Sequence, residues 1–329
     1  MKCIKVTKEN ENQRIDKLVR KYLNLAPLSF IYKTFRKKDV KVNNHWVNGD
    51  YIVKLDDEIK IYVTDEQLAD FSKPKEVKKS DIKLDIIYED DNILIINKPV
   101  GLLVVEDENE KSNTLTNFVQ SYLFTKGEFK NNGLDFRPSP VHRLDRNTSG
   151  VCIYAKNLFS SQELIEMFKS RTNIDKFYLA LVLGKPQKNE GCIDAPLIKD
   201  PKTKIVKVAR MERGSLSAKT EYKVICSNSE LSLLKVHLLT GRTHQIRVHL
   251  AYINCPIVGD AKYGDFSFNK EFYKKYKFEN QFLHSYKVTF GKIEGKLSYL
   301  SGKSFLAKLP KNEDEILDSL KFNYCINKL

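Results

Sequence analysis

The chain has 329 residues, with 56 lysines and arginines against 42 aspartates and glutamates, a formal net charge of +14. It has no run of about 18 apolar residues and no apolar signal-peptide core at its N-terminus, which excludes a membrane-spanning helix and favours a cytoplasmic protein. The six cysteines lie far apart in the sequence, so we expect reduced thiols and no zinc site of closely spaced cysteines. The excess of positive charge suits a polyanionic partner.

Basic residues are concentrated near the N-terminus. Between Arg14 and Lys41 they outnumber acidic residues nine to two. Apolar residues recur there at helical spacing, first at Ile15, Leu18, Val19, Tyr22 and Leu23 and then, after Pro27, at Leu28, Ile31, Tyr32 and Phe35. This periodicity predicts two short amphipathic helices that carry most of the charge on their outer faces.

Two predicted strands follow these helices, VKVNNHWVN from Val40 and DEIKIYV from Asp57. QRIDKLV and SFIYKTFRKKDVKVN resemble the αL-type RNA-binding domain of a small-subunit ribosomal protein and of many RNA-modifying enzymes. We therefore expect an RNA-binding domain over residues 12–63, and a small domain with a solvated basic face is the alternative. In the expected RNA-binding domain, the residues that would contact RNA phosphates are Arg14, Lys17, Arg36, Lys37 and Lys38.

The remaining chain divides into three expected segments. Residues 64–80 are polar and aperiodic, which is typical of a linker, residues 81–312 form a second domain, and residues 313–329 form a C-terminal tail. Strands are predicted within residues 85–98 and near residues 180, 222 and 235. A helix is predicted from Ser160, with a capping box to Glu163. Strands are too frequent for regular βαβ alternation, so this domain mixes α and β elements.

The stretch VHRLDRNTSGV, residues 141–151, places Asp145 between two arginines and near a histidine. It fits either a solvated charged turn or a site in which a carboxylate stays ionised against a reacting group. Ser149 lacks the G-x-S-x-G context of a nucleophilic serine. Thr148 and Ser149 are therefore interpreted as turn or cap residues.

A second polar stretch, TGRTHQIRVHLAYINCPIVGD, begins at Thr240. It fits a helix capped by Thr243, and it also fits a strand with alternate residues on one face; both place Arg247 near the end of an element. His244 and His249 are five residues apart, a spacing that does not stack them on one helix face, and we expect no metal site. No phosphate-binding loop or dinucleotide fingerprint is present, so no cofactor is expected.

Four motifs occur in a characteristic order: INKPVGLLV, HRLDRNTSG, DKFYLALVLG and TGRTHQIRVHL. Over about residues 80–310 they resemble the RluA family of pseudouridine synthases, and RIDKLVRKYL and KDPKTKIVKV favour its RluC branch over its RluD branch. The resemblance implies an α+β fold with a mixed, mainly antiparallel sheet. It also implies a monomeric enzyme that isomerises uridines of large-subunit (23S-type) ribosomal RNA without a cofactor.

Matching these motifs residue by residue makes Asp145 the catalytic aspartate and Arg247 the arginine that pairs with it. Arg143 matches the arginine that enters the RNA helix where the flipped base has left, and Tyr178 matches the tyrosine that packs on the uracil. Whether Asp145 attacks uracil carbon 6 or the ribose, or removes a ribose proton, stays open. VVEDENEK departs from many relatives, which carry a histidine near Val105.

Two alternatives remain beside a ribosomal RNA enzyme. A transfer RNA substrate fits the same residues. A non-catalytic RNA-binding or assembly factor would have no need to keep Asp145, Tyr178 and Arg247 together. An RNA methyltransferase would need a glycine-rich site for its methyl donor, and the sequence contains no such site.

Overall fold

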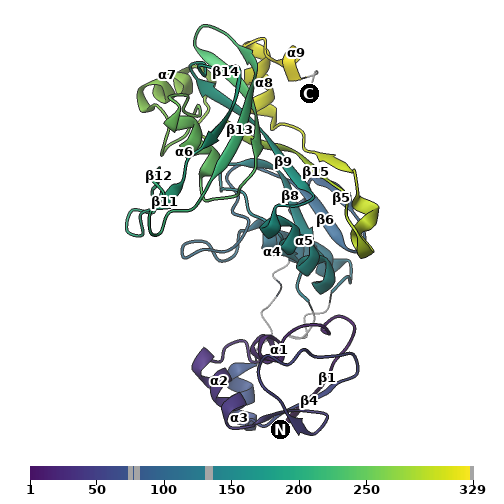
Figure 1. Cartoon of the computed structure of the whole chain (residues 1–329). Coiled ribbons are helices and arrows are strands. Elements are labelled where there is room, and N and C mark those ends of the chain that lie inside the picture. Colours follow the sequence, from purple (N-terminus) through teal and green to yellow (C-terminus); the bar gives the residue numbers. More distant parts are fainter. Residues whose placement is uncertain (73–76, 78–81, 130–135, 327–329) are drawn as a thin grey trace. The chain divides into compact units, whose positions relative to one another are not determined.

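The computed structural model describes residues 1–72, 77, 82–129 and 136–326, which fold into two compact units (Figure 1). One unit comprises Met1–Ile82, Thr116–Ser139 and Ala155–Gln162, and the other comprises Lys83–Leu115, Pro140–Tyr154 and Glu163–Leu329. None of the helices in the described ranges has the length and apolar character needed to cross a membrane.

The N-terminal segment contains the two predicted amphipathic helices, α1 (Ile15–Tyr22) and α2 (Leu28–Arg36). They accompany a four-stranded sheet in the order β1 (Lys2–Lys5), β4 (Glu58–Ile61), β2 (Val40–Val42) and β3 (His45–Trp46). The apolar faces of helices and sheet share one core, in which Leu18, Ile31 and Ile59 are buried. The segment expected as a linker begins with a further helix, α3 (Asp65–Phe71), which has a capping box between Thr64 and Gln67.

A ten-stranded sheet, the largest in the described chain, confirms the mixed, mainly antiparallel fold (Figure 1). Its strand order is β10-β13-β14-β9-β15-β8-β6-β5, with β16 beside β15 and β7 beside β8. The pairs β10–β13, β13–β14, β14–β9, β9–β15, β15–β16 and β5–β6 are antiparallel, whereas β8 and β15 run parallel. The bounds are β5 (Ile86–Glu89), β6 (Ile93–Lys98), β7 (Ser139–Pro140), β8 (Ser149–Ala155), β9 (Ile174–Leu183), β10 (Glu190–Asp194), β13 (Lys219–Ser227), β14 (Leu231–Leu238), β15 (Leu283–Phe290) and β16 (Ser304–Leu306). The strands predicted near residues 180, 222 and 235 are β9, β13 and β14.

The remaining elements are α4 (Leu115–Thr125), α5 (Leu158–Ser170), α6 (Gln245–Tyr252), α7 (Phe266–Tyr276), α8 (Lys311–Ser319), α9 (Asn323–Ile326), the 3-10 helix Gly295–Leu300 and the paired strands β11 (Leu197–Lys199) and β12 (Val206–Val208). The predicted capping box at Ser160 and Glu163 is wrong. Helix α5 starts two residues earlier, and Ser160 donates its backbone N–H to Oδ1 of Asn157 at 2.9 Å. Asn157 is as good a cap as serine, and the local sequence does not decide between them.

The segment expected as a C-terminal tail contains α8 and α9, and Ile316 and Leu317 on α8 are buried. The expectation that all six cysteines are reduced is wrong for Cys226 of β13 and Cys325 of α9, which the structure joins by a disulfide. Packing of α9 against β13 brings their Cα atoms to 6.2 Å although 99 residues separate them in the sequence.

Glu313, in the first turn of α8, is fully buried, and neither of its carboxylate oxygens has a hydrogen-bond partner among the described residues. Burial raises its pKa from 4.5 to about 8. Because the folded-state pKa is raised, the unfolding free energy decreases as the pH rises from about 4.5 to about 8.

We predict that Glu313→Gln raises the Tm at pH 8 by about 2–4 °C, since the amide removes the cost of a buried charge, and that it weakens the pH dependence of Tm. Differential scanning calorimetry at pH 5 and pH 8 measures both effects. Glu315→Gln, on the same helix but exposed, is the matched control and should leave Tm nearly unchanged. The same shift for Glu313→Gln at both pH values would contradict the prediction.

Candidate active site

Asp145 lies in the loop between β7 and β8, and hydrogen bonds fix the end of this loop to its surroundings. The backbone N–H of Thr148 donates to the carbonyl oxygen of Asp145 at 3.1 Å. Gln281 donates to Oγ1 of Thr148 at 2.7 Å, and Oγ of Ser149 lies 2.8 Å from Nδ1 of His284. Thr148 thus lies in a turn, as predicted, whereas Ser149 is the first residue of β8 and not a turn or cap residue.

The glycine that ends this motif permits a close approach of two strands. Gly150 has a φ of +109°, and a Cβ atom there would lie 2.2 Å from the carbonyl oxygen of Ser285 on β15. Only glycine combines this backbone conformation with such a contact. Gly150 therefore allows β8 to leave the loop directly alongside β15.

Lys98 and His142 support the same loop from other elements. The fully buried Nζ of Lys98 donates to the carbonyl oxygens of Pro99, Leu102 and Arg146 at 2.7, 2.7 and 2.9 Å, and burial lowers its pKa to about 8. Nε2 of His142 accepts from the backbone N–H of Ile153 at 3.2 Å, and burial lowers the pKa of this histidine to about 3, so it is neutral. Lys98 was not among the predicted site residues, although a lysine at the end of the apolar run ILIIN was a usable signal.

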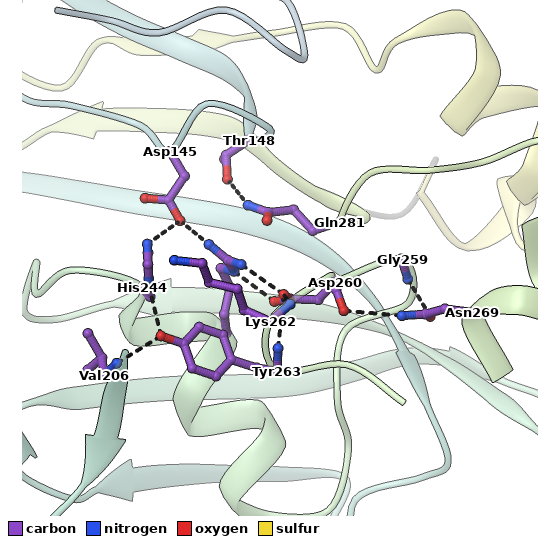
Figure 2. Close-up of polar contacts among 11 residues, drawn as sticks. Asp145, Thr148, Val206, His244, Gly259, Asp260, Lys262, Tyr263, Asn269 and Gln281 are labelled. Carbon is purple, nitrogen blue, oxygen red and sulfur yellow. Dashed lines mark hydrogen bonds and ion pairs between the residues drawn. The ribbon is translucent and has the colours of Figure 1, made fainter. Parts of the chain in front are cut away.

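Arg247, on α6, connects the loop that carries Asp145 to a second carboxylate. Its Nη1 donates to Oδ2 of Asp145 at 2.8 Å, while Nε and Nη2 donate to Oδ2 and Oδ1 of Asp260 at 2.7 and 2.8 Å (Figure 2). The Arg247 side chain is 8% exposed and the Asp260 side chain is fully buried. The structure therefore brings Asp145 and Arg247 together across 102 residues of sequence.

Asp260 balances most of the positive charge of Arg247. Burial raises the pKa of Asp260, but hydrogen bonds and charge from Arg247, together with the backbone N–H groups of Lys262 and Tyr263, lower it below its ordinary value. Burial likewise lowers the pKa of Arg247, yet Asp260 and Asp145 raise it above its ordinary value. Both groups stay charged, and the sequence analysis missed Asp260, which ends the quoted stretch at PIVGD.

Only one oxygen of Asp145 is engaged by side chains of the described residues. Oδ2 contacts Arg247 and lies nearest to His244, while Oδ1 has no side-chain partner among the described residues, and the side chain is 30% exposed (Figure 2). Tyr178, on β9, is 5% exposed, and its pKa is raised by burial and further by the charge of Asp145, so its phenol is protonated at neutral pH. Arg143 is exposed and makes no ion pair within the described chain.

The polar residues of TGRTHQIRVHL serve two separate purposes. Helix α6 begins one residue later than a Thr243 cap requires, with His244 at its N-cap, and the alternative strand is wrong. Gln245 and His249 are buried and make structural hydrogen bonds to Thr220. His244 instead lies at the site, with Nδ1 2.9 Å from Oη of Tyr263 and Nε2 4.0 Å from Oδ2 of Asp145. Among the described residues no group of three or more His, Cys, Asp or Glu could hold a metal ion.

The five basic residues predicted to contact RNA phosphates in the N-terminal segment are all exposed: Arg14, Lys17, Arg36, Lys37 and Lys38. Arg14 is already paired with Asp16 at 2.7 Å, and Nζ of Lys38 lies 5.0 Å from the ring centroid of Trp46. Lys17 on α1, and Arg36 and Lys37 at the end of α2, are therefore the more available cations of this set.

Comparison with known proteins agrees with this geometry. Residues 92–252, which include Asp145, Tyr178 and Arg247, match the family described as RNA pseudouridylate synthase. An uncharacterized RNA pseudouridine synthase of Mycoplasma capricolum is 33% identical over 94% of this chain and 97% of its own length. Ribosomal large subunit pseudouridine synthase C of Escherichia coli is 32% identical over 82% of each chain.

A solved structure shows the same fold. The human protein RNA Pseudouridylate Synthase Domain Containing 4 superposes with a TM-score of 0.57 at 25% identity, covering 72% of this chain and 92% of its own. These matches confirm the resemblance that the four motifs predicted. The chain belongs to the RluA-type family of RNA pseudouridine synthases, enzymes that isomerise uridine to pseudouridine in RNA.

Proposed function

We propose that this enzyme modifies specific uridines of large-subunit ribosomal RNA, as a monomer in the cytoplasm, with Asp145 as its catalytic carboxylate. The main observation in support is the geometry of Asp145, whose Oδ2 accepts from Arg247 at 2.8 Å while Oδ1 has no side-chain partner among the described residues. Relatives named ribosomal large subunit pseudouridine synthase C, from three Vibrio species and Escherichia coli, support the class of RNA.

The reaction fits a site built from protein groups alone. Conversion of uridine to pseudouridine breaks the bond from N1 to ribose C1′ and forms a bond from C5 to C1′. C5 loses its proton and N1 gains one, so no electrons are exchanged with a cofactor. Oδ1 of Asp145 can serve as the nucleophile or the base. Arg247, whose pKa is raised, offsets the charge of the carboxylate and donates no proton.

Two further residues have properties that suit a flipped base. A uridine stacked in a helix must leave the stack to reach a carboxylate in a protein site. Arg143 is exposed, two residues from Asp145, and can stack in the gap that the base leaves. Tyr178 is buried and protonated, so it offers the uracil an aromatic face and a hydrogen-bond donor.

We predict that Asp145→Asn lowers tritium release from RNA labelled at uracil C5 by at least about 10³-fold, while its RNA affinity stays within about twofold of wild type. The assay uses unassembled large-subunit ribosomal RNA, with transfer RNA as a second substrate. Asp194→Asn, which changes an exposed aspartate, is the matched control. Release from transfer RNA alone would overturn the ribosomal assignment, and no release from either RNA would overturn the proposed function.

Comparing pseudouridine maps of ribosomal RNA from cells with and without the gene then identifies the target.

We predict that Asp260→Asn lowers kcat by about 10–100-fold and also lowers Tm, because Arg247 loses its buried counter-charge. A double change, Arg247→Met with Asp260→Leu, should recover Tm because it removes both buried charges, but it should not recover kcat. Tritium release and thermal unfolding of the three proteins measure the two effects separately. Recovery of kcat in the double variant would contradict a role for Arg247 at Asp145.

We also propose that the basic end of α2 binds RNA phosphates. Changing Arg36, Lys37 and Lys38 together to Gln should raise the Kd for RNA and reduce the slope of log Kd against log salt by about 2–3. Changing Lys270, Lys274 and Lys275 on α7 removes the same charge from exposed positions elsewhere and should alter the slope less. Equal slopes for the two triple variants would show that net charge alone, and not this surface, sets the affinity.

A further inference from the structure

His244 approaches the same oxygen of Asp145 that Arg247 binds. Its Nε2 lies 4.0 Å from Oδ2 of Asp145, and its Nδ1 lies 2.9 Å from Oη of Tyr263 (Figure 2). The guanidinium carbon of Arg247 lies 5.2 Å from the centroid of the Tyr263 ring. Asp145, His244, Tyr263 and Arg247 therefore form one contiguous group, of which only Asp145 and Arg247 belong to the proposed catalytic set.

The backbone of His244 is held in an unfavourable conformation. It has φ 54° and ψ 19°, in the left-handed region, which is sterically unfavourable for a residue other than glycine. The neighbouring Gln245 maintains this geometry, because its buried amide accepts from Thr240 at 2.6 Å and donates to Thr220 at 2.9 Å. Such strain persists where surrounding contacts fix it, and it is concentrated at functional sites.

Tyr263 determines which ring nitrogen of His244 carries the hydrogen. The backbone N–H of Val206, on β12, donates to Oη of Tyr263 at 3.0 Å. With Val206 as its donor, Oη of Tyr263 can direct its own hydrogen to Nδ1 of His244, and in the tautomer that we assign Nδ1 accepts it. In the neutral imidazole the remaining hydrogen must be on Nε2, the nitrogen that faces Asp145.

We propose that His244 is a positioning residue, which donates its Nε2–H to Oδ2 of Asp145 when RNA fills the site and thereby leaves Oδ1 as the reacting oxygen. This role rests on the proposed function of Asp145. A distance of 4.0 Å is too long for a hydrogen bond in the free protein, and catalytic hydrogen bonds often shorten to their working length only when substrate binds. Two donors on one oxygen, from Arg247 and His244, orient the carboxylate more firmly than one.

Burial favours this neutral state of His244, and the neighbouring charges act in both directions. Burial lowers its pKa below the ordinary 6.5, the negative charges of Asp145 and Asp260 oppose that effect, and the positive charges of Arg247 and Lys262 add to it. Because the folded-state pKa is lowered, the competent neutral ring persists at neutral pH and is lost as the pH falls through that lowered value. Protonation of Nδ1 would also displace the hydrogen that Tyr263 donates.

Three variants separate this role from a structural one. His244→Asn tolerates the left-handed backbone but is too short to reach Asp145, and it should lower kcat for tritium release by about 10–100-fold with KM within about twofold. His244→Gln places an amide donor near the position of Nε2, and it should retain kcat within about fivefold of wild type and lose the acidic limb of the kcat profile. Tyr263→Phe should move that limb to higher pH, because the neutral ring loses its donor.

Two readouts decide the outcome. Equal loss of kcat in His244→Asn and His244→Gln with an unchanged acidic limb, or wild-type kcat in both, would overturn the role of His244. Nitrogen-15 NMR of the histidine rings, assigned with His244→Asn, should show the hydrogen of His244 on Nε2, and a hydrogen on Nδ1 would overturn the proposal whatever the activity. A wild-type enzyme that releases no tritium contradicts the proposed function instead, so the two failures are distinguishable.

Discussion

One buried guanidinium sets the charge balance of the site. Arg247 makes two hydrogen bonds to Asp260 and one to Asp145, and this inequality distinguishes the two carboxylates. Asp260 is fully buried, bidentate with the guanidinium and bonded to backbone N–H groups, so no oxygen is left for a substrate. Asp145 shares the same cation but keeps Oδ1 open. Arg247 therefore has two roles. It compensates the buried charge of Asp260, and it orients Asp145, the carboxylate that we propose as catalytic.

The loop that carries Asp145 is fixed before any RNA arrives. Lys98 binds the carbonyl of Arg146, the residue after Asp145, while Gln281 and His284 bind Thr148 and Ser149. These contacts come from β6, from β15 and from the residue two positions before β15, strands of one sheet, so the sheet itself sets the position of the carboxylate. A charge held in place in this way needs little reorganisation during the reaction, which is the main source of electrostatic catalysis.

Local sequence patterns were sufficient to predict an element where its apolar residues lie on one face and so repeat at a regular spacing. The helices α1 and α2 could be predicted because their apolar residues repeat every three to four positions, which is a property of the segment alone. The start of α5 could not, since Asn157 and Ser160 are both acceptable caps and packing chooses between them. The same limit applies to His244 at the N-cap of α6, because the neighbouring Gln245 is held by Thr220, 25 residues earlier in the chain.

The sequence by itself determined the family, the mixed and mainly antiparallel fold, and the candidate site residues Asp145, Tyr178 and Arg247. It could do so because the four motifs match those of the family in residue type, in spacing and in order along the chain. Apart from the pair of Asp145 and Arg247, which the resemblance implied, only the tertiary structure decided which groups meet. The pairing of Arg247 with Asp260 and the approach of His244 to Asp145 are contacts between segments that no local pattern links. The strength of these electrostatic contacts depends on burial and on distances of a few ångström. Both are properties of the folded chain and not of any one segment.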